Sequence, residues 1–426
     1  MKMRGATKAI ICFLSSAIFA VLDLLDCALC IFYRFLDSVL EANPIPCHCR
    51  SGGEEAGHKI SETLYERRNI FRDQILGFVS EKGLGDDEEK EGKKKGGRRS
   101  PRWSDCSCES CVSWQNSPEK EKETLHLVIK EPKRAETSQD GSFQTENVIF
   151  LHGFLSSSSI WVETVFPNLS DDAVQRVKMF AVDLLGFGKS PKPENCLYRI
   201  EDHLEKIERT VIKQFGLTSF HLVSHSMGCI LALALAAKYP NSVKSITLIA
   251  PPYFPSIEAE ASHNALNRLA ERKIWPPSAF FSSVMSWYEH LGRTICFIIC
   301  RNHLIWEWII KLLTGKKHLA FQIRDITRHT HRSGWHTMHE VLCRGAKFMD
   351  NYLRTIQEEG IFMKMIHGDK DQTVPLECSY NIKLRVPKAE LQIIKNADHS
   401  SVIIKRKKEF TMALEKSWLL NLSIDD

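Results

Sequence analysis

The segment Ser224-His225-Ser226-Met227-Gly228 carries the strongest fold signal in this 426-residue chain. Residues 220–223 before it form an apolar run of strand length, and residues 229–237 after it are rich in strong helix formers. A strand, a tight turn and a helix are the surroundings that a nucleophile elbow requires. Such a turn exposes one hydroxyl, while the helix N-terminus offers free backbone N–H groups to a developing oxyanion. We therefore predict Ser226 as a catalytic nucleophile.

The first position of the elbow departs from the usual Gly-x-Ser-x-Gly pattern, because the chain has Ser224 there. A small residue is needed at this position, since strand and helix backbones approach closely around the turn. Serine adds only a hydroxymethyl group and meets that requirement. A small-x-Ser-x-Gly string also arises by chance, so the strand and helix signals around it must show whether it is a nucleophile elbow.

Strand and helix signals alternate from about residue 122 onward. A helix is expected at 200–215 and another directly after the elbow. Such alternation predicts an α/β fold with a mostly parallel sheet and helices on both faces. The predicted strands are 124–130, 147–151, 179–183, 220–223, 245–249, 361–366 and 390–394.

The alternation stops between about residues 252 and 353, after the strand that ends near Ile249. In this kind of fold, such an interruption marks a helical cap inserted over the site. The insertion is rich in aromatic residues, which favours an apolar substrate pocket, although packing within the cap explains each aromatic equally well. The aromatic residues are Tyr253, Phe254, Trp275, Phe280, Phe281, Trp287, Tyr288, Trp306, Trp308 and Trp335.

Five motifs follow one another along this part of the chain, and together they resemble those of α/β-hydrolases of the single-domain esterase type. They are His152-Gly153, Asp183-Leu-Leu-Gly-Phe-Gly-Lys-Ser190, the elbow, His367-Gly-Asp-Lys-Asp-Gln-Thr-Val-Pro375 and Asn396-Ala-Asp-His-Ser400. The variant elbow, the helix after it and the long N-terminal extension further resemble the plant BODYGUARD group. That group is associated with cuticle formation and usually described as probable lysophospholipases.

A serine nucleophile needs an imidazole to accept its proton and a carboxylate to orient that imidazole. Asp371 lies just beyond the predicted strand 361–366, and His399 lies just beyond the strand that ends at Ile394. The order serine, aspartate, histidine is the order expected for this fold. We therefore predict Ser226, Asp371 and His399 as the catalytic residues. Asp369 is an alternative acid, but the resemblance favours Asp371.

Backbone N–H groups are expected to form the oxyanion hole. The elbow implies that Met227 supplies one, and the resemblance implies that Phe154 supplies the other. His152 and Gly153 are expected to support this loop, and His225 either lines the pocket or has a structural role. Neither a phosphate-binding loop nor a dinucleotide fingerprint occurs in the sequence, so no cofactor is expected.

Residues 1–36 have the pattern of a targeting segment. Lys2, Arg4 and Lys8 precede a charge-free run at 9–22, as in a secretory signal or signal-anchor. Asp23 and Asp26 disfavour a helix that spans a membrane through residue 35. A buried amphipathic helix is the alternative, and the pattern leaves open whether the segment is cleaved. We expect the secretory pathway, with an extracellular, cell-wall or plasma-membrane location.

Residues 37–120 are predicted to form a tether. Helical spacing of apolar residues from Ile60 to Phe78 predicts one amphipathic helix, and the charged block 86–99 predicts a solvated loop. The chain has 14 cysteines, clustered at Cys47-His-Cys49 and Cys106-Ser-Cys-Glu-Ser-Cys111. Because these clusters lack the compact spacing of a zinc module, disulfides or lipidation are expected and no metal site is assigned.

Four histidines cluster in the predicted cap. No carboxylate pattern accompanies them, so we expect surface or pocket-rim histidines instead of metal ligands. They are His329, His331, His336 and His339.

We predict a serine hydrolase that cleaves or transfers fatty-acyl esters of lipid, lysophospholipid or cutin type through an acyl-enzyme. A hydrolase-fold ligand sensor or scaffold with little turnover is the alternative. The net charge of +5 is small for this length, which argues against nucleic acid as a partner, whereas a membrane or cell-wall surface is expected. The predicted parts are a targeting segment (1–36), a tether (37–120), a hydrolase core (121–252 and 354–426) and a cap (253–353).

Overall fold

The computed structural model describes residues 5–41, 54–55, 58–64, 102–116, 124–133, 145–271 and 274–419. The predicted loop 86–99, Cys47 and Cys49 lie outside these ranges. So does the predicted amphipathic helix beyond Leu64, while its first residues, 60–64, form a turn in the structure.

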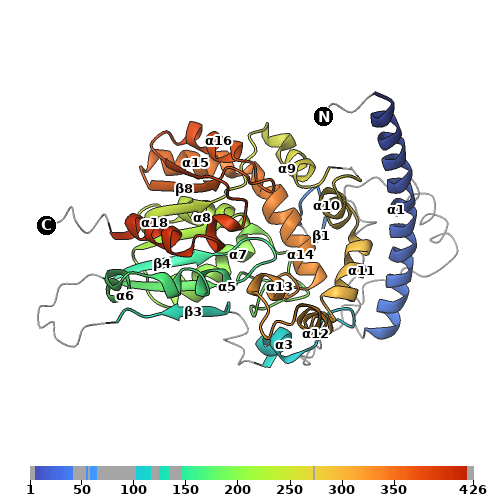
Figure 1. The fold of residues 1–426 in the computed structure, drawn as a ribbon, viewed down its shortest axis with the longest axis horizontal. Coiled ribbons are helices and arrows are strands. Elements are labelled where there is room, and N and C mark those ends of the chain that lie inside the picture. The colour runs from blue at the N-terminus through green and yellow to red at the C-terminus, as the bar shows by residue number, and fades with distance from the viewer. Residues whose placement is uncertain are drawn as a thin grey trace, which may run out of the picture.

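A seven-stranded sheet forms the centre of the molecule (Figure 1). The strand order is β3-β5-β4-β6-β7-β8-β9, and only β3 is antiparallel to its neighbour. The predicted α/β fold with a mostly parallel sheet is thereby confirmed. The strands are β3 (Leu127–Lys130), β4 (Glu146–Leu151), β5 (Val177–Val182), β6 (Phe220–His225), β7 (Val243–Ile249), β8 (Phe362–Gly368) and β9 (Glu390–Ile394).

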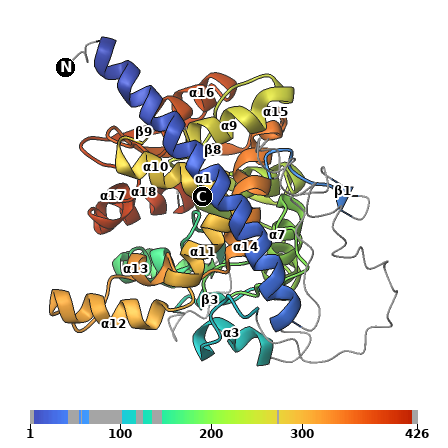
Figure 2. The same ribbon diagram turned by 90° about the vertical axis from the view of Figure 1, so that its right-hand side faces the viewer.

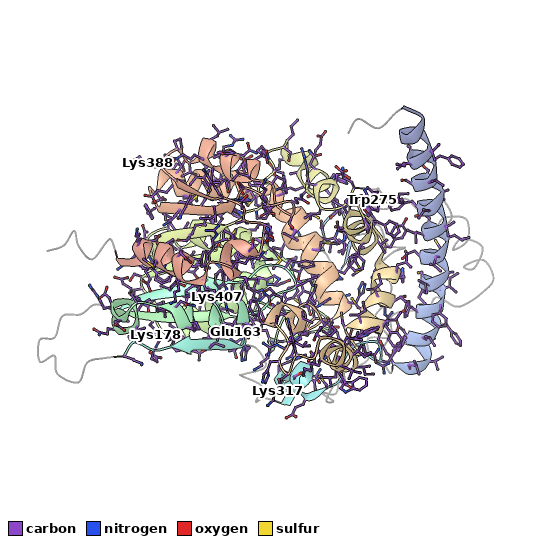
Figure 3. All side chains as sticks on the ribbon, in the orientation of Figure 1. Glu163, Lys178, Trp275, Lys317, Lys388 and Lys407 are labelled. Carbon is purple, nitrogen blue, oxygen red and sulfur yellow. The ribbon has the colours of Figure 1, made fainter. Side chains whose placement is uncertain are left out.

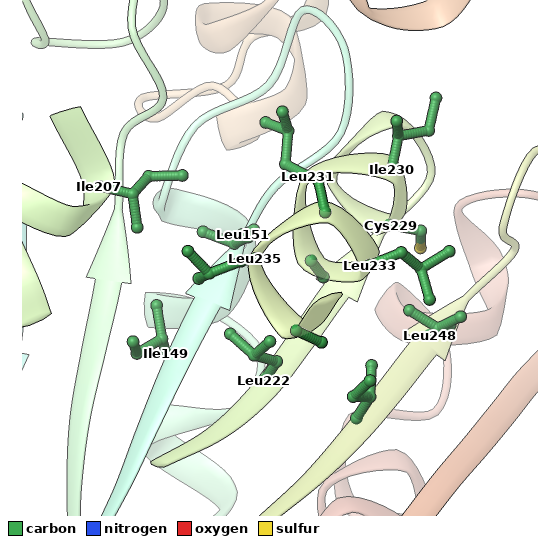
Figure 4. Packing of buried hydrophobic residues seen from close by; sticks show 14 of the residues in the cluster. Ile149, Leu151, Ile207, Leu222, Cys229, Ile230, Leu231, Leu233, Leu235 and Leu248 are labelled. Carbon is green, nitrogen blue, oxygen red and sulfur yellow. The ribbon is translucent and has the colours of Figure 1, made fainter. Parts of the chain in front are cut away.

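Helices cover both faces of the sheet. On one face, α8 (Met227–Lys238) packs against β4, β6 and β7 and is flanked by α7 (Ile200–Ile207) and α15 (Met349–Glu358). The leucines of α8, among them Leu231, Leu233 and Leu235, lie buried among apolar side chains of the sheet (Figure 4). On the other face lie α5 (Ser159–Val162), α17 (Ser401–Ile404) and α18 (Lys407–Leu419). Because parallel strands are covered on both faces, β6 is buried at every residue, its two histidines and its serine included.

The cap is inserted between β7 and β8. Its contacts with the core include Ser333 Oγ, which donates to the Gly186 carbonyl at 2.8 Å. Glu163 Oε1 accepts a hydrogen bond from Arg324 of the cap at 2.7 Å, and its carbonyl accepts one from Lys407 Nζ at 3.0 Å (Figure 3). The main cap helices before α15 are α9 (Ala261–Leu269), α10 (Pro277–Trp287), α11 (Glu289–Ile299), α12 (His303–Thr314), α13 (Phe321–Asp325) and α14 (His331–Thr337).

Two of the four cap histidines contradict the expectation of surface or rim positions. His336 and His339 are 1% and 0% exposed, because they lie on the inward face of α14 and the turns that follow it. His339 Nδ1 is 3.0 Å from Thr63 Oγ1, and the ring packs against Trp335. Burial lowers the pKa of His339 to about 3, so the ring is neutral.

A long N-terminal helix, α1 (Gly5–Leu40), runs along the outside of the cap beside α10 and α11 (Figure 2). The part from Ile10 to Leu40 is long and apolar enough to cross a membrane, a property that signal sequences share. One side of the helix contacts the cap, and Phe19 stacks on Tyr288 of that surface. Trp275 lies on the same side of the molecule (Figure 3).

Candidate active site

Ser226 lies in the turn between β6 and α8, with backbone angles of φ 52° and ψ −122°. A positive φ is strained for a residue with a side chain and costs on the order of 1–3 kcal/mol. The turn is held because the Ser226 N–H donates to the Ile249 carbonyl at 2.8 Å. This conformation directs the serine side chain out of the strand at the carboxyl edge of the sheet, as a nucleophile elbow requires.

Close backbone packing explains the small residues around the serine. A Cβ on Gly228 would lie 2.6 Å from the His152 carbonyl oxygen, and a Cβ on Gly153 would lie 3.1 Å from Ser226 Cβ. Ser224 is completely buried at the first position of the motif. The turns after β4 and β6 therefore lie against each other, and the loop that carries Gly153 and Phe154 lies beside Ser226.

Asp371 and His399 come together from the loops after β8 and β9. His399 Nδ1 is 2.7 Å from Asp371 Oδ2, and Asp371 Oδ1 accepts hydrogen bonds from the N–H groups of Thr373 and Val374, both at 2.9 Å. Burial disfavours the charged form of Asp371, but hydrogen bonds from His367, His399 and Val374 outweigh it and lower the pKa. Asp371 is therefore an ionised carboxylate aimed at an imidazole.

Asp369, the alternative acid, and the nearby Asp398 make other contacts. Asp369 is exposed, and its backbone N–H pairs with the Ile394 carbonyl. Asp398 Oδ1 accepts from the N–H groups of Ser400 and Ser401, at 3.1 and 2.7 Å, and so closes the turn around His399. Both positions are consistent with structural roles.

His367 was not singled out from the sequence, although it begins one of the quoted motifs. It is fully buried, and its Nε2–H donates to the Val374 carbonyl at 2.8 Å and lies 3.5 Å from Asp371 Oδ2. Its Nδ1 is 2.7 Å from Ser379 Oγ. The side chain thus fixes the loop that carries Asp371. The sequence signal that could have identified His367 is its position at the end of the predicted strand 361–366.

His225 connects the elbow to the loop of His399. Its Nε2–H donates to the His399 carbonyl at 3.0 Å, and the two ring centroids are 4.7 Å apart. Burial first, and the neighbouring His399 second, lower the pKa of His225 to about 3. A neutral His225 therefore positions the backbone of His399 next to Ser226. The structure has no hydrogen bond between Ser226 Oγ and the His399 ring, and in ligand-free enzymes such bonds are often formed only with substrate.

The predicted oxyanion donors flank Ser226. Met227 is the first residue of α8, so its N–H has no acceptor within the helix. Phe154 follows Gly153 in the turn after β4, and His152 holds that turn: its Nε2 accepts from the Leu184 N–H at 2.9 Å and its Nδ1–H donates to the Gly153 carbonyl at 2.7 Å. The two residues predicted as donors therefore lie in the turns after β4 and β6, next to Ser226.

Asp183, the first residue of the glycine-rich motif, is bonded to the backbone around it. Its carboxylate accepts hydrogen bonds from the N–H groups of Ser158 and Lys189, at 2.7 and 2.8 Å, and is 3.2 Å from His126 Nδ1. Burial opposes ionisation, but these hydrogen bonds and the nearby histidines lower its pKa. Asp183 thus fixes the glycine-rich turn after β5.

A pocket of about 980 Å³ lies where α9 of the cap meets the loop after Asp371. Its lining combines Phe254 and Trp287 with polar side chains such as Asn264, Arg268 and Asn381. Neither Ser226 nor His399 is among the lining residues. The pocket therefore adjoins the acid loop without containing the reacting groups.

Comparisons with known proteins show the family of the chain. Residues 146–283 match the family model for the alpha/beta hydrolase fold. The chain is 48% identical over 413 residues to "Probable lysophospholipase BODYGUARD 4" of Arabidopsis thaliana, covering 95% of this chain and 96% of the relative. "Probable lysophospholipase BODYGUARD 5" of the same plant is 44% identical, with 95% and 94% covered. Among solved structures, an esterase from Exiguobacterium antarcticum is similar with a TM-score of 0.46 at 15% identity, covering 69% of this chain and 95% of the esterase.

Proposed function

Because this chain belongs to the BODYGUARD group of α/β-hydrolases, whose named members are probable lysophospholipases, it is an ester hydrolase, and we propose that Ser226 is its nucleophile. The observation that carries this proposal is the 2.7 Å contact between Asp371 Oδ2 and His399 Nδ1 beside a serine with φ 52°. The similarity to the first of these relatives extends over 95% of the chain.

The reaction proceeds through an acyl-enzyme. Ser226 Oγ attacks the ester carbonyl while His399 Nε2 accepts the hydroxyl proton, and Asp371 stabilises the resulting imidazolium. The N–H groups of Met227 and Phe154 stabilise the negative oxygen of the tetrahedral intermediate. His399 then returns the proton to the leaving alcohol, and a water molecule activated by His399 releases the fatty acid. An alcohol that replaces this water receives the acyl group, so transfer needs no additional residue.

The substrate that we propose is a fatty-acyl ester of lipid, lysophospholipid or cutin type, used in forming a plant cuticle. The names of the relatives support the lysophospholipid class, and the aromatic cap supports an apolar acyl chain. Cap aromatics such as Tyr288 and Trp335 are buried, so part of the aromatic surface stabilises the cap itself.

We further propose that α1 is retained and holds the enzyme at a membrane surface after entry into the secretory pathway. Its polar residues are already bonded to the cap: Asp26 Oδ1 accepts from the His290 N–H at 3.0 Å, and Tyr33 Oη is 2.9 Å from Thr294 Oγ1. The opposite side exposes apolar side chains suited to lipid, as in helices that lie in the membrane interface. These are Ile10, Phe13, Leu14, Ile18, Val21, Leu24, Leu25, Phe32, Phe35, Val39 and Leu40.

Covalent labelling tests the nucleophile. A fluorophosphonate probe should label the full-length chain, and the Ser226→Ala variant should remain unlabelled. Purified protein should release fatty acid from a lysophosphatidylcholine, and Ser226→Ala should not. Binding of this lipid without release of fatty acid by the labelled enzyme would favour the sensor alternative.

Vesicle flotation tests the membrane proposal. The double variant Phe13→Asp/Phe35→Asp should bind phosphatidylcholine vesicles less than the parent while it keeps activity on a soluble ester. Leu384→Asp is the matched control, because Leu384 is 78% exposed on α16 (Glu377–Arg385), away from α1. Equal loss of binding in both variants would contradict a specific role for α1.

A further inference from the structure

Three cysteines and a histidine from distant parts of the chain converge beside the cap. Cys106, Cys108 and Cys111 lie at the start of α3 (Glu109–Asn116), and His303 is the first residue of α12. Their three Sγ atoms and one imidazole nitrogen all lie within 4.8 Å of one another. In the sequence, the cysteine clusters lack the compact spacing of a zinc module, and no metal site was expected there. His303, which completes the set, is 192 positions from Cys111.

The distances agree with tetrahedral zinc coordination. His303 Nε2 is 3.3 Å from Cys108 Sγ and 3.5 Å from Cys111 Sγ. With zinc–sulfur and zinc–nitrogen bonds of about 2.3 Å and 2.0–2.1 Å, a sulfur and a nitrogen ligand of a tetrahedron lie about 3.6 Å apart. These two distances suit a zinc ion bonded to Cys108, Cys111 and His303, and Cys106 Sγ lies within 4.8 Å of each of the other three ligand atoms.

The surroundings orient each ligand. His303 is completely buried, and its Nδ1 is 3.1 Å from Glu307 Oε1, so a proton on Nδ1 leaves Nε2 free to coordinate. A carboxylate behind a histidine is the usual arrangement around protein-bound zinc. The Cys108 N–H donates to Cys106 Sγ at 3.4 Å, and Ser110 Oγ is 3.2 Å from Cys108 Sγ. The backbone N–H of Cys108 thereby orients the sulfur of Cys106.

A disulfide accounts for less of this arrangement. It would use two of the three cysteines and leave the third thiol beside a buried imidazole. A second cluster, made of Cys296, Cys300 and His329, offers only three groups, with His329 Nε2 3.8 and 3.9 Å from the sulfur atoms. The four-residue cluster therefore makes the stronger site.

We propose that Cys106, Cys108, Cys111 and His303 bind one structural Zn²⁺ ion. Four protein ligands leave no open coordination position, so the ion stabilises structure and takes no part in ester hydrolysis. The ion fastens the segment 102–116 to α12. Arg102 and Trp103 of this segment in turn contact Asp37 of α1, both at 2.7 Å. Zinc thus helps to hold the N-terminal helix against the cap.

Metal analysis of the full-length chain, purified in detergent under reducing conditions, tests the proposal. Mass-spectrometric zinc content should fall by one ion per chain in Cys111→Ser and in His303→Ala, and should be unchanged in Cys12→Ser, whose thiol is exposed on α1. His303→Cys should retain the ion, because cysteine supplies another zinc ligand. Co²⁺ in place of zinc should give the absorption of a tetrahedral cobalt thiolate in the parent protein and not in Cys111→Ser. Equal zinc content in the parent and Cys111→Ser would overturn the proposal.

Two further measurements keep the test decisive. If Cys111→Ser does not fold, Glu307→Gln replaces it: chelator competition should show zinc held about 10–100-fold more weakly, because the histidine loses its orienting carboxylate. An unchanged affinity would overturn the assignment of His303. Thiol labelling of the denatured, unreduced protein should find Cys106, Cys108 and Cys111 reactive. A Cys106–Cys111 disulfide in metal-free protein would overturn the zinc site.

Discussion

The active-site loops and the contact between α1 and the cap are organised in opposite ways. Ser226, Asp371 and His399 each follow a strand of one parallel sheet, so the carboxyl edge of the sheet brings them together. The other region has no such frame. Asp37 of α1 pairs with Arg293 of α11, 256 positions away, at 2.6 and 2.7 Å.

The residues of the first region are expected to serve catalysis, and those of the second region to hold α1 on the cap. In the first region short motifs contain most of the required information, because the fold supplies the distances. In the second region no common sheet fixes the distances, and single polar contacts between segments far apart in the chain hold the elements together. Substitutions in the first region should therefore remove activity and leave the fold intact, whereas substitutions in the second should destabilise the protein and leave the chemical step intact.

The largest effect is expected from Ser226→Ala and His399→Ala. Each should lower kcat by about 10⁶-fold, because nucleophile and base act as one unit. Thermal unfolding monitored by circular dichroism should remain close to that of the parent. A large fall in melting temperature in either variant would contradict the separation between the two regions.

The next largest effect is expected from Asp371→Asn, which should lower kcat by about 10⁴-fold because an amide favours the wrong imidazole tautomer. Asp369→Asn is the matched control, since Asp369 is exposed and two residues away. Steady-state hydrolysis of a soluble ester measures both. The acid assignment is wrong if Asp369→Asn is the more damaging change.

In the second region, Arg293→Ala should destabilise the full-length protein by about 1.5–3 kcal/mol, because it removes two hydrogen bonds to the buried carboxylate of Asp37, which keeps Arg102 and Trp103 as partners. Arg293 and Asp37 are both 8% exposed, and Arg293 also lies 4.4 Å from the ring centre of Tyr33. Denaturant unfolding measures the loss. The control is Arg324→Ala, which breaks the more exposed pair with Glu163 and should cost about 0–1 kcal/mol. Equal losses would show that the cap does not depend on α1.

The smallest effect is expected from the length of the acyl chain, because the substrate would contact both the catalytic residues and the cap. If the cap encloses an apolar acyl chain, each added methylene contributes about 0.8 kcal/mol, and kcat/KM should rise by about three- to fourfold per methylene until the site is full. A series of aryl esters below their micelle concentrations measures this slope on the full-length enzyme. A preference for acetate over octanoate would contradict the lipid-ester proposal and leave a general esterase.

The sequence predicted the sheet more completely than the cap. The predicted strand 147–151 corresponds to Glu146–Leu151, and 245–249 corresponds to Val243–Ile249. Buried parallel strands are continuous apolar runs between turn residues, so a local pattern suffices. The positions of Ser226, Asp371 and His399 directly after strands were likewise predictable, although only the structure shows how His367 supports Asp371.

The cap and its partners depended on information that no local pattern contains. The burial of His336 and His339 follows from which side of α14 faces the segment around Thr63, and the pairing of Asp37 with Arg293 follows from where α1 lies. Cys106 and His303 are joined only by the folded chain. Charged or metal-binding side chains look alike in sequence whether they face solvent or a remote partner.

The contact between α1 and the cap forms between segments that the ribosome makes at very different times. The cap residues that receive Asp26 and Asp37 are made more than 250 positions later. At about 5–20 residues per second, the ribosome needs on the order of tens of seconds to reach them. During that interval the apolar helix has no cap to cover it, and a lipid bilayer or a chaperone must shield it. The side of α1 that carries Asp26 and Asp37 is therefore expected to stay uncovered by the protein itself until the cap has been made.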